Sequence, residues 1–384
     1  MDQFDVAIIG AGPAGSSAAI ALARRGYTVA LIDKEHFPRE KLCGDFINPS
    51  NWPLLEELGV RRELLSHHHE AVTAFRITSF SGAEAGAALP SGGGSYGIGL
   101  RRLHFDQILF NKAMGEGAAG LLGLRVKRLH RNADGWRIEF SRGENVEQLG
   151  AKLLVGADGR NSWVARHLDM IREPVEQGRA IGFQLRLRYS PGLAGRVEIH
   201  LFPGGYGGLL GLGDGTINLC LAADKRCVRG GAGLDSLLES HLPRNPFLKA
   251  ILERSEPIGQ ARSTYPVYFA PRRSVGDRVV LIGDAARVNE PVTGEGIYFA
   301  MKSGALAARA IDEALVRGDL SAARLMDYRR RCQSEFRARR GLNSLIRFFM
   351  YRPALLSPLV RLSGSRDILL QPLVQAICRP YPVA

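Results

Sequence analysis

A glycine-rich turn inside the first 33 residues limits the possible folds of this chain more than any other feature. Residues 4–9 form a short apolar run rich in β-branched side chains, the sequence GAGPAG occupies positions 10–15, and an alanine-rich helix is expected over 16–25. A second strand is expected over 27–32, and Asp33 follows it. A strand, a G-x-G-x-x-G turn, a helix and a terminal acid in this order are typical of a dinucleotide-binding α/β unit.

Each glycine of the turn has a separate physical role. Gly10 permits the tight turn, Gly12 lets the backbone approach a pyrophosphate, and Gly15 lets the helix pack closely on the strand. The free N–H groups at the helix N-terminus favour the phosphates. Asp33 lies where a carboxylate accepts hydrogen bonds from an adenosine ribose. The alternative is a tight glycine turn that binds no ligand. That alternative does not explain why a strand, a helix and a terminal acid accompany the glycines in this order.

Length and composition describe a globular protein with a sizeable core. At 384 residues and 45% hydrophobic residues, the chain is long enough for two domains or for one large domain with an inserted lobe. No run of eighteen uncharged apolar residues exists, so no membrane-spanning helix is expected. The first strand begins within four residues of the N-terminus, so no signal peptide is expected. Five scattered cysteines without a C-x-x-C pair favour a reducing cytoplasm and no metal site.

The positive charge is concentrated near the C-terminus. The net charge is +13, and residues 329–366 contribute +9 of it through ten arginines and one glutamate. No nucleic-acid-binding motif accompanies them, so we expect no nucleic acid partner. Apolar residues alternate with these arginines, which fits contact with the inner face of a membrane. A C-terminal helical lobe with solvated arginines is the equal alternative, and the oligomeric state stays open.

The pattern along the chain indicates a discontinuous nucleotide-binding domain. Helical and buried-strand patterns dominate residues 1–73, 100–178 and 270–340, which we assign to this domain. Short β-rich runs separated by Gly or Pro dominate 74–99 and 179–269, including an expected strand over 263–269 and an expected loop over 91–99. We assign these to an antiparallel substrate lobe, in which His200, Phe202, Tyr206 and Tyr265 could face either a substrate or the core. Residues 341–384 form a C-terminal helical segment.

Three further motifs carry chemistry. Arg102 stands just ahead of an expected helix, where a guanidinium suits bidentate contact with phosphate or ribose oxygens. An expected strand ends at Gly156-Ala157-Asp158-Gly159, and another ends at Gly283-Asp284. The run PVTGEG at 291–296 then precedes a long helix expected from Gly296 to about 316. Its glycine N–H groups and the helix N-terminus would stabilise negative charge nearby.

With these motifs in this order, the sequence resembles the FAD-dependent oxidoreductases of the p-hydroxybenzoate hydroxylase fold, and within them the geranylgeranyl reductase family. The resemblance covers at least residues 5–308. It implies an α/β fold, namely a Rossmann-type FAD-binding domain with an inserted antiparallel β-sheet substrate lobe and a C-terminal helical segment. It also implies FAD contacts by Gly10, Gly12, Pro13, Ala14, Gly15, Asp33, Lys34, Lys41, Cys43, Gly44, Arg102, Asp158, Gly283, Asp284, Pro291, Gly294, Glu295, Gly296 and Ile297.

The departures from the family keep the reaction open. The stretch 202–209 lacks the tryptophan and lysine of prenyl reductases, and Asp45 stands after Cys43-Gly44 where a further glycine is expected. Both features are closer to members that hydroxylate aromatic or polyketide-derived lipids. The tryptophan halogenase signature is absent, which disfavours halogenation. Cys43, which lies beside the flavin by resemblance, is the candidate near the reaction, and the catalytic residues are otherwise unknown.

Three functions therefore remain as expectations. The first is a reductase that transfers a hydride from reduced FAD to an isoprenoid double bond. The second is a flavin-dependent monooxygenase that forms a C4a-hydroperoxide in a hydrophobic pocket. The third is a non-catalytic electron-relay protein. The substrate is expected to be a hydrophobic small molecule, and NADH, NADPH or an external carrier would reduce the flavin, because no second dinucleotide motif is evident.

Overall fold

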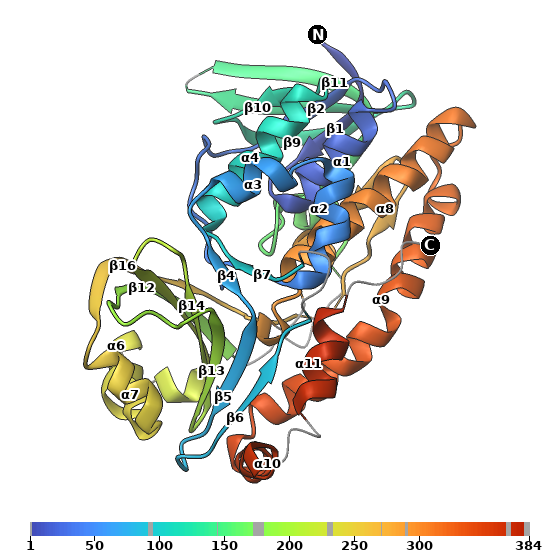
Figure 1. Cartoon of the computed structure of the whole chain (residues 1–384). Coiled ribbons are helices and arrows are strands. Elements are labelled where there is room, and N and C mark those ends of the chain that lie inside the picture. The colour runs from blue at the N-terminus through green and yellow to red at the C-terminus, as the bar shows by residue number, and fades with distance from the viewer. Residues whose placement is uncertain are drawn as a thin grey trace.

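The computed structural model describes residues 2–90, 95–143, 145–171, 180–228, 233–269, 271–288, 291–365 and 370–379. Its upper part in Figure 1 is built on an eight-stranded sheet with a parallel centre. The order runs β17-β18-β11-β1-β2-β8, and β10 and β9 extend from β11 as an antiparallel meander. The bounds are β1 Gln3–Ile9, β2 Val29–Ile32, β8 Ala119–Leu121, β9 Arg125–Arg131, β10 Trp136–Arg142, β11 Asn145–Gly156, β17 Val275–Gly276 and β18 Val279–Leu281.

Both faces of the central strands are buried, which explains their continuous apolar sequence. Val6 and Ile8 of β1 face one core, together with helices α1, α4 and α8. Ala7 and Ile9 face a second core on the other side, formed with the meander and the short helix α5. The bounds are α1 Pro13–Ala23, α4 Arg102–Gly115, α5 Trp163–His167 and α8 Gly296–Val316. The last agrees with the helix expected from Gly296.

The lower part is a seven-stranded sheet that takes strands from two distant stretches of chain. Its order is β16-β12-β15-β14-β13-β5-β6, and every pair is antiparallel except β13 with β5. Helices α6 and α7 cover one face, while the C-terminal helices lie on the other (Figure 1). The bounds are β5 Ala74–Thr78, β6 Glu84–Ala88, β12 Ala180–Arg188, β13 Arg196–Phe202, β14 Gly205–Gly211, β15 Thr216–Asp224, β16 Glu256–Thr264, α6 Gly233–Ser240 and α7 Pro246–Leu252.

The last three helices of the described part are α9 Ala322–Met350, α10 Pro353–Ser365 and α11 Leu370–Cys378. The boundary expected at residue 340 lies inside α9. Apolar side chains of all three helices join the core of the seven-stranded sheet. Among the described residues, no helix combines the length and the apolar character needed to cross a bilayer.

A small three-stranded sheet and two short helices connect the upper and lower parts. The sheet has the order β3-β7-β4, with β3 Phe46–Ile47, β4 Glu70–Val72 and β7 Gly97–Gly99, and the helices are α2 Trp52–Leu58 and α3 Arg61–Ser66. The loop expected over 91–99 therefore ends in a strand, and positions 91–94 lie outside the described residues.

The strand expected over 263–269 was misplaced. The strand is β16 at Glu256–Thr264, and Phe269 contributes only an isolated bridge to Val288. Among the described strands, β16 pairs only with β12, at the edge of the sheet, and most of its residues are exposed. An edge strand facing solvent lacks the apolar alternation on which the prediction relied.

Candidate functional site

One cavity joins the two parts of the molecule, with a volume of about 1420 Å³. One half is lined by the glycine turn, the loop 39–44 and the ends of β11 and β18, and the other half is apolar. Of the nineteen cofactor contacts expected from the sequence, sixteen line this cavity: Gly10, Gly12, Pro13, Ala14, Asp33, Lys34, Lys41, Cys43, Gly44, Arg102, Asp158, Asp284, Pro291, Gly294, Gly296 and Ile297. Gly15, Gly283 and Glu295 do not.

The glycine turn is closed by packing that leaves no room for side chains at two positions. Gly10 has a φ of +109°, and a Cβ added there would lie 2.3 Å from the Ala157 carbonyl oxygen. A Cβ on Gly15 would lie 1.9 Å from the carbonyl oxygen of Gly10. At Gly12, by contrast, the nearest atom would be an Arg39 nitrogen at 3.5 Å. The backbone at Gly12 is therefore open toward the cavity, as a pyrophosphate requires.

Asp33 is buried at the end of β2 and holds the glycine turn in place. Its Oδ2 accepts a hydrogen bond from the Ala11 N–H at 2.8 Å, and its Oδ1 accepts one from the Glu35 N–H at 3.0 Å. Arg39, which the sequence analysis missed, lies 3.7 Å from Asp33 and 3.2 Å from Asp106. Only its place in a charged loop pointed to it. Lys34, next to Asp33, is exposed and lies 3.8 Å from Glu35.

Arg102 lines the cavity, and its guanidinium is already paired. It donates to both carboxylate oxygens of Asp106, at 2.6 and 2.8 Å. Burial lowers the pKa of Arg102, but Asp106 and Cys43 together raise it above its ordinary value. Arg102 is therefore a fixed cation in the cavity wall, and its strongest partner belongs to the same helix.

Lys41 and Asp284 both present charge to the cavity from opposite ends of the chain. Lys41 lines the cavity, so its side chain is accessible to solvent although protein atoms lie all around it. Burial lowers the pKa of Lys41 and Arg102 lowers it further, while Asp284 acts in the opposite direction. Among the described residues, none donates a hydrogen bond to the Asp284 side chain, so this carboxylate can accept hydrogen bonds from a ligand.

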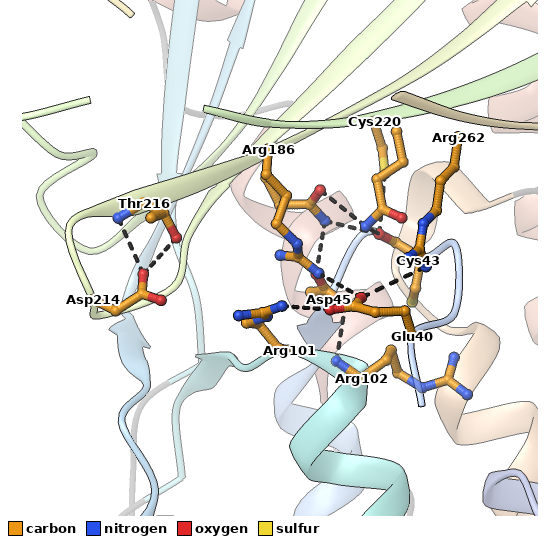
Figure 2. A network of polar contacts seen from close by, with 12 residues as sticks. Glu40, Cys43, Asp45, Arg101, Arg102, Arg186, Asp214, Thr216, Cys220 and Arg262 are labelled. Carbon is orange, nitrogen blue, oxygen red and sulfur yellow. Dashed lines mark hydrogen bonds and ion pairs between the residues drawn. The ribbon is translucent and has the colours of Figure 1, made fainter. Parts of the chain in front are cut away.

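The loop that carries Cys43 is held against the seven-stranded sheet (Figure 2). The backbone carbonyl oxygen of Cys43 accepts hydrogen bonds from Gln184 Nε2 at 2.9 Å, from Asn218 Nδ2 at 2.8 Å and from Cys220 Sγ at 3.1 Å. Burial raises the pKa of the Cys43 thiol, although the nearby Arg102 lowers it in part. The sequence analysis did not identify Gln184 and Asn218. The available signal was that each is a polar side chain within a mostly apolar strand.

Asp45 and Glu40 connect the same loop to arginines from several elements (Figure 2). The buried Asp45 carboxylate pairs with Arg186 at 3.0 Å and accepts hydrogen bonds from Asn218 Nδ2 and the Arg102 N–H, both at 3.1 Å. Burial raises the pKa of Asp45 to about 6, although Arg186 opposes this. Glu40 pairs with Arg101, with Arg186 at 3.5 Å and with Arg262 at 3.7 Å.

Asp158 lies in the cavity wall, but its carboxylate is fully used by the chain itself. Its Oδ1 accepts from Ser162 Oγ at 2.5 Å, and its Oδ2 accepts from the N–H groups of Trp163 and Val164 at 2.7 and 3.0 Å. Burial raises the pKa of Asp158 despite these hydrogen bonds. Asp158 therefore holds the start of α5 beside the cavity.

The run 291–297 presents backbone to the cavity and turns its acid away. Gly296 and Ile297 begin α8 at the cavity wall, and a Cβ on Gly296 would meet no atom of the described residues within 4 Å. Glu295 instead forms a buried ion pair with Arg339 of α9, and burial raises its pKa. Glu295 was among the residues expected to contact the cofactor, and its side chain points to α9 and does not line the cavity. Gly283 packs with a φ of +56° against Ala14.

The other half of the cavity is an apolar chamber between the seven-stranded sheet and the C-terminal helices. Tyr206 lines it, whereas His200 and Phe202 lie on the other face of the sheet, where His200 hydrogen-bonds Thr78 at 2.8 Å. Tyr265 lies outside the wall and is 42% exposed. The chamber is lined from the sheet by Phe75, Ile77, Val197, Ile199 and Leu210, and from the helices by Leu342, Ile346, Phe349, Leu356, Val360, Leu373 and Val374.

Comparisons with known proteins agree with this geometry. The profile of the family described as "FAD binding domain" matches residues 3–183. A menaquinone reductase of Mycobacterium tuberculosis is 32% identical over 336 residues, which cover 81% of this chain and 77% of that protein. A digeranylgeranylglycerophospholipid reductase of Methanosarcina acetivorans is 31% identical over 353 residues, with coverages of 84% and 79%.

Solved structures show the same fold at lower identity. A geranylgeranyl bacteriochlorophyll reductase-like protein of Thermoplasma acidophilum superposes with a TM-score of 0.81 at 21% identity, covering 100% of this chain and 97% of that one. A flavin-dependent brominase has the same TM-score of 0.81 at 22% identity, with coverages of 98% and 94%. At these identities the likeness concerns the fold alone.

Proposed function

The chain belongs to the geranylgeranyl reductase family of FAD-dependent oxidoreductases, and on that premise we propose that it reduces a carbon–carbon double bond in the isoprenoid chain of a lipid-like substrate. The observation that carries the proposal is that one cavity combines a polar half with an apolar chamber, whose lining suits an isoprenoid chain. The named relatives support it, because menaquinone and digeranylgeranylglycerophospholipids both carry long isoprenoid chains.

The residues of the polar half fit FAD. The open backbone at Gly12 and the N-terminus of α1 suit the pyrophosphate, and the Asp284 carboxylate has acceptor capacity for hydroxyl groups. At both Gly44 and Gly296, a Cβ would meet none of the described atoms within 4 Å, so the backbone is open for close approach of a planar ring. When bound there, FAD supplies the two-electron reduction.

The chain itself contributes orientation, charge and a proton. The Cys43 Sγ keeps its proton at neutral pH because burial raises the pKa of the thiol. A protonated thiol can donate a proton but is a poor nucleophile. The N–H groups of Gly296 and Ile297, at the N-terminus of the 21-residue helix α8, favour negative charge beside them. The apolar walls of the chamber exclude water from the double bond.

The reaction can be tested on the purified, flavin-loaded protein. The enzyme is photoreduced without oxygen and mixed with digeranylgeranylglycerophospholipid or menaquinone, and the lipid is then analysed by mass spectrometry. We expect products that gain two hydrogen atoms per double bond under anaerobic conditions. A product that forms only with oxygen and gains one oxygen atom would replace this proposal with a monooxygenase. No change in either lipid, with or without oxygen, would contradict both and favour an electron-relay protein.

We also propose that a nicotinamide dinucleotide reduces the flavin while bound transiently. The described residues contain no second strand–glycine turn–helix unit that would hold it permanently. Anaerobic mixing with NADH or with NADPH should bleach the flavin absorbance, and the faster of the two identifies the donor. If neither bleaches it while dithionite does, an external electron carrier is required.

A further inference from the structure

The outer surface of α9 and α10 gathers most of the exposed apolar side chains. Of the eight large hydrophobic residues that are exposed in the described part of the chain, five lie between 345 and 362. These five define what we name the α9–α10 face: Leu345, Phe348, Leu355, Leu359 and Leu362, which are 56%, 47%, 54%, 41% and 51% exposed. The remaining three, Val146, Tyr265 and Val316, are scattered along the chain.

Helical spacing places these side chains on one side of each helix. Leu355, Leu359 and Leu362 recur at four- and three-residue intervals on α10, and Leu345 and Phe348 are three residues apart near the end of α9. The two helices are consecutive and in contact, with α10 at the foot of α9 in Figure 1. Together they form one apolar surface. A contiguous exposed apolar surface of this kind marks an interaction site, whereas single exposed apolar residues are normal in any protein.

The charged residues of this segment of chain have one sign. From Gly341 to Ser365 the sequence contains Arg347, Arg352 and Arg361 and no acidic residue. Arg352 and Arg361 are exposed, and the Arg352 guanidinium lies 3.9 Å above the ring of Phe348. An exposed cation stacked on an aromatic ring suits the boundary between phosphate headgroups and acyl chains. There the cation attracts the phosphates and the ring is buried among the chains.

The face is continuous with the apolar chamber. Leu345 and Leu359 are exposed and also line the cavity, while Ile346 and Phe349 of α9 and Leu356 of α10 line it from inside. The same two helices thus carry an inner apolar surface toward the substrate chamber and an outer one toward solvent. A long isoprenoid chain could then pass between a lipid layer and the chamber without crossing water, which would be costly for each CH₂ group.

We propose that the α9–α10 face docks on an anionic phospholipid surface and that the substrate chain enters the chamber past Leu345 and Leu359. The identity of the entering chain rests on the proposed function, whereas the docking does not. A second copy of the chain would fit this face less well, because two copies would bring their arginines together and the segment 341–365 contributes no acidic residue to pair with them. Anionic lipid supplies the complementary charge.

The test uses the full-length, flavin-loaded protein and vesicles of phosphatidylcholine alone or with one-quarter phosphatidylglycerol. We expect at least about tenfold tighter binding to the anionic vesicles in a flotation assay, weakened by added salt. The double variant Leu355→Glu/Leu362→Glu, at positions that do not line the cavity, should bind at least about tenfold more weakly. Val316→Glu, at a residue 78% exposed at the end of α8, is the matched control and should bind as the wild type does.

Three results would overturn docking: no binding of the wild type to either vesicle, equal binding by the double variant, or a wild-type dimer that the double variant abolishes. Flavin content and circular dichroism verify that each variant is folded.

Turnover of detergent-dispersed substrate separates this proposal from the proposed function. If docking holds, the double variant should lose turnover of vesicle-embedded substrate but keep turnover of dispersed substrate. If the wild type binds vesicles but reduces neither form, the docking stands and the reductase assignment fails.

Discussion

Asp45 has a backbone conformation that usually favours glycine. Its φ is +58°, and its carboxylate is fully buried between Arg186, Asn218 and the start of α4. The carboxylate therefore joins the loop of Cys43 to both parts of the molecule. An acid at the position after Cys43-Gly44 looked like a departure from the family pattern, and the structure gives it a positioning role in this chain.

The raised pKa of Asp45 predicts a pH dependence of stability. Burial raises the pKa from 3.8 to about 6, so the folded state binds the proton more tightly than the unfolded state does. Stability from this group is therefore complete at low pH and decreases as the pH rises from about 4 to about 6. Relative to Asp45→Asn, the free energy of unfolding of the wild type should fall by up to about 3 kcal/mol over this range and stay constant above it.

Denaturant titrations at several pH values measure this difference. Only its change with pH is interpreted, because the new amide of Asn adds a constant offset. Asp134→Asn, at an exposed residue of the β9–β10 turn, controls for the loss of one carboxylate. A wild-type-minus-variant difference that is constant between pH 4 and pH 7 would show that Asp45 does not titrate there.

At the scale of elements, the helix glycines differ sharply in what surrounds them. Gly15 lies in α1, where a Cβ would overlap the Gly10 carbonyl, whereas Gly341 lies in α9, where a Cβ would meet no atom within 4 Å. The same substitution therefore has opposite expected effects in two helices. Close packing at the turn overrides the ordinary preference of helices for alanine.

We predict that Gly15→Ala abolishes FAD binding or destabilises the protein by more than about 3 kcal/mol, because the new Cβ would lie only 1.9 Å from the Gly10 carbonyl oxygen, a backbone atom that cannot move aside. Gly341→Ala should stabilise it by about 0.5–1 kcal/mol. Flavin content after gel filtration and the midpoint of thermal unfolding measure both. Retention of full flavin content in Gly15→Ala would contradict the assigned role of the turn.

Contacts between elements also connect the run 291–297 with the C-terminal helices. Glu295 pairs with Arg339 of α9, and Arg339 in turn donates to the Arg379 carbonyl at 3.2 Å. Asn343 of α9 donates to Thr293 Oγ1 at 2.8 Å. The helices that close the chamber therefore also hold the backbone of the run 291–297, which borders the half of the cavity where we propose that FAD binds.

At the scale of the whole molecule, a single substitution in the apolar half of the cavity should reduce lipid turnover without affecting flavin binding in the polar half. Gly208 of β14 lines the apolar half, and a Cβ there would lie 3.5 Å from Ile199, an ordinary contact distance. Gly208→Phe should fill part of the chamber and reduce lipid turnover by at least about tenfold, with flavin content unchanged. Gly86→Phe, at an exposed position of β6 that does not line the cavity, is the control.

Turnover of dispersed lipid and flavin absorbance per protein are the two measurements. Equal loss of flavin and of turnover in Gly208→Phe would mean that the substitution disturbs the fold and not the chamber alone. Unchanged turnover would mean that the substrate binds elsewhere, which would contradict the chamber assignment.

The sequence by itself determined the features that depend on neighbouring residues. The glycine turn, the strand before it and the start of α8 at Gly296 follow from backbone requirements that nearby residues meet or fail to meet. That is why a family could be suggested and sixteen of nineteen expected cofactor residues line one cavity. The exposed strand β16, without such a local signal, was misplaced.

Only the tertiary structure decided the partners of side chains whose contacts lie far away in sequence. Nothing near Glu295 in sequence predicts its pairing with Arg339, and nothing near Cys43 predicts that Gln184 and Asn218 hold its carbonyl oxygen. The apolar chamber combines strands from 74–88 and 180–224 with helices from 322–378, so it has no contiguous sequence signature. Partner choice depends on which distant surfaces meet, and that is settled by packing of the whole chain.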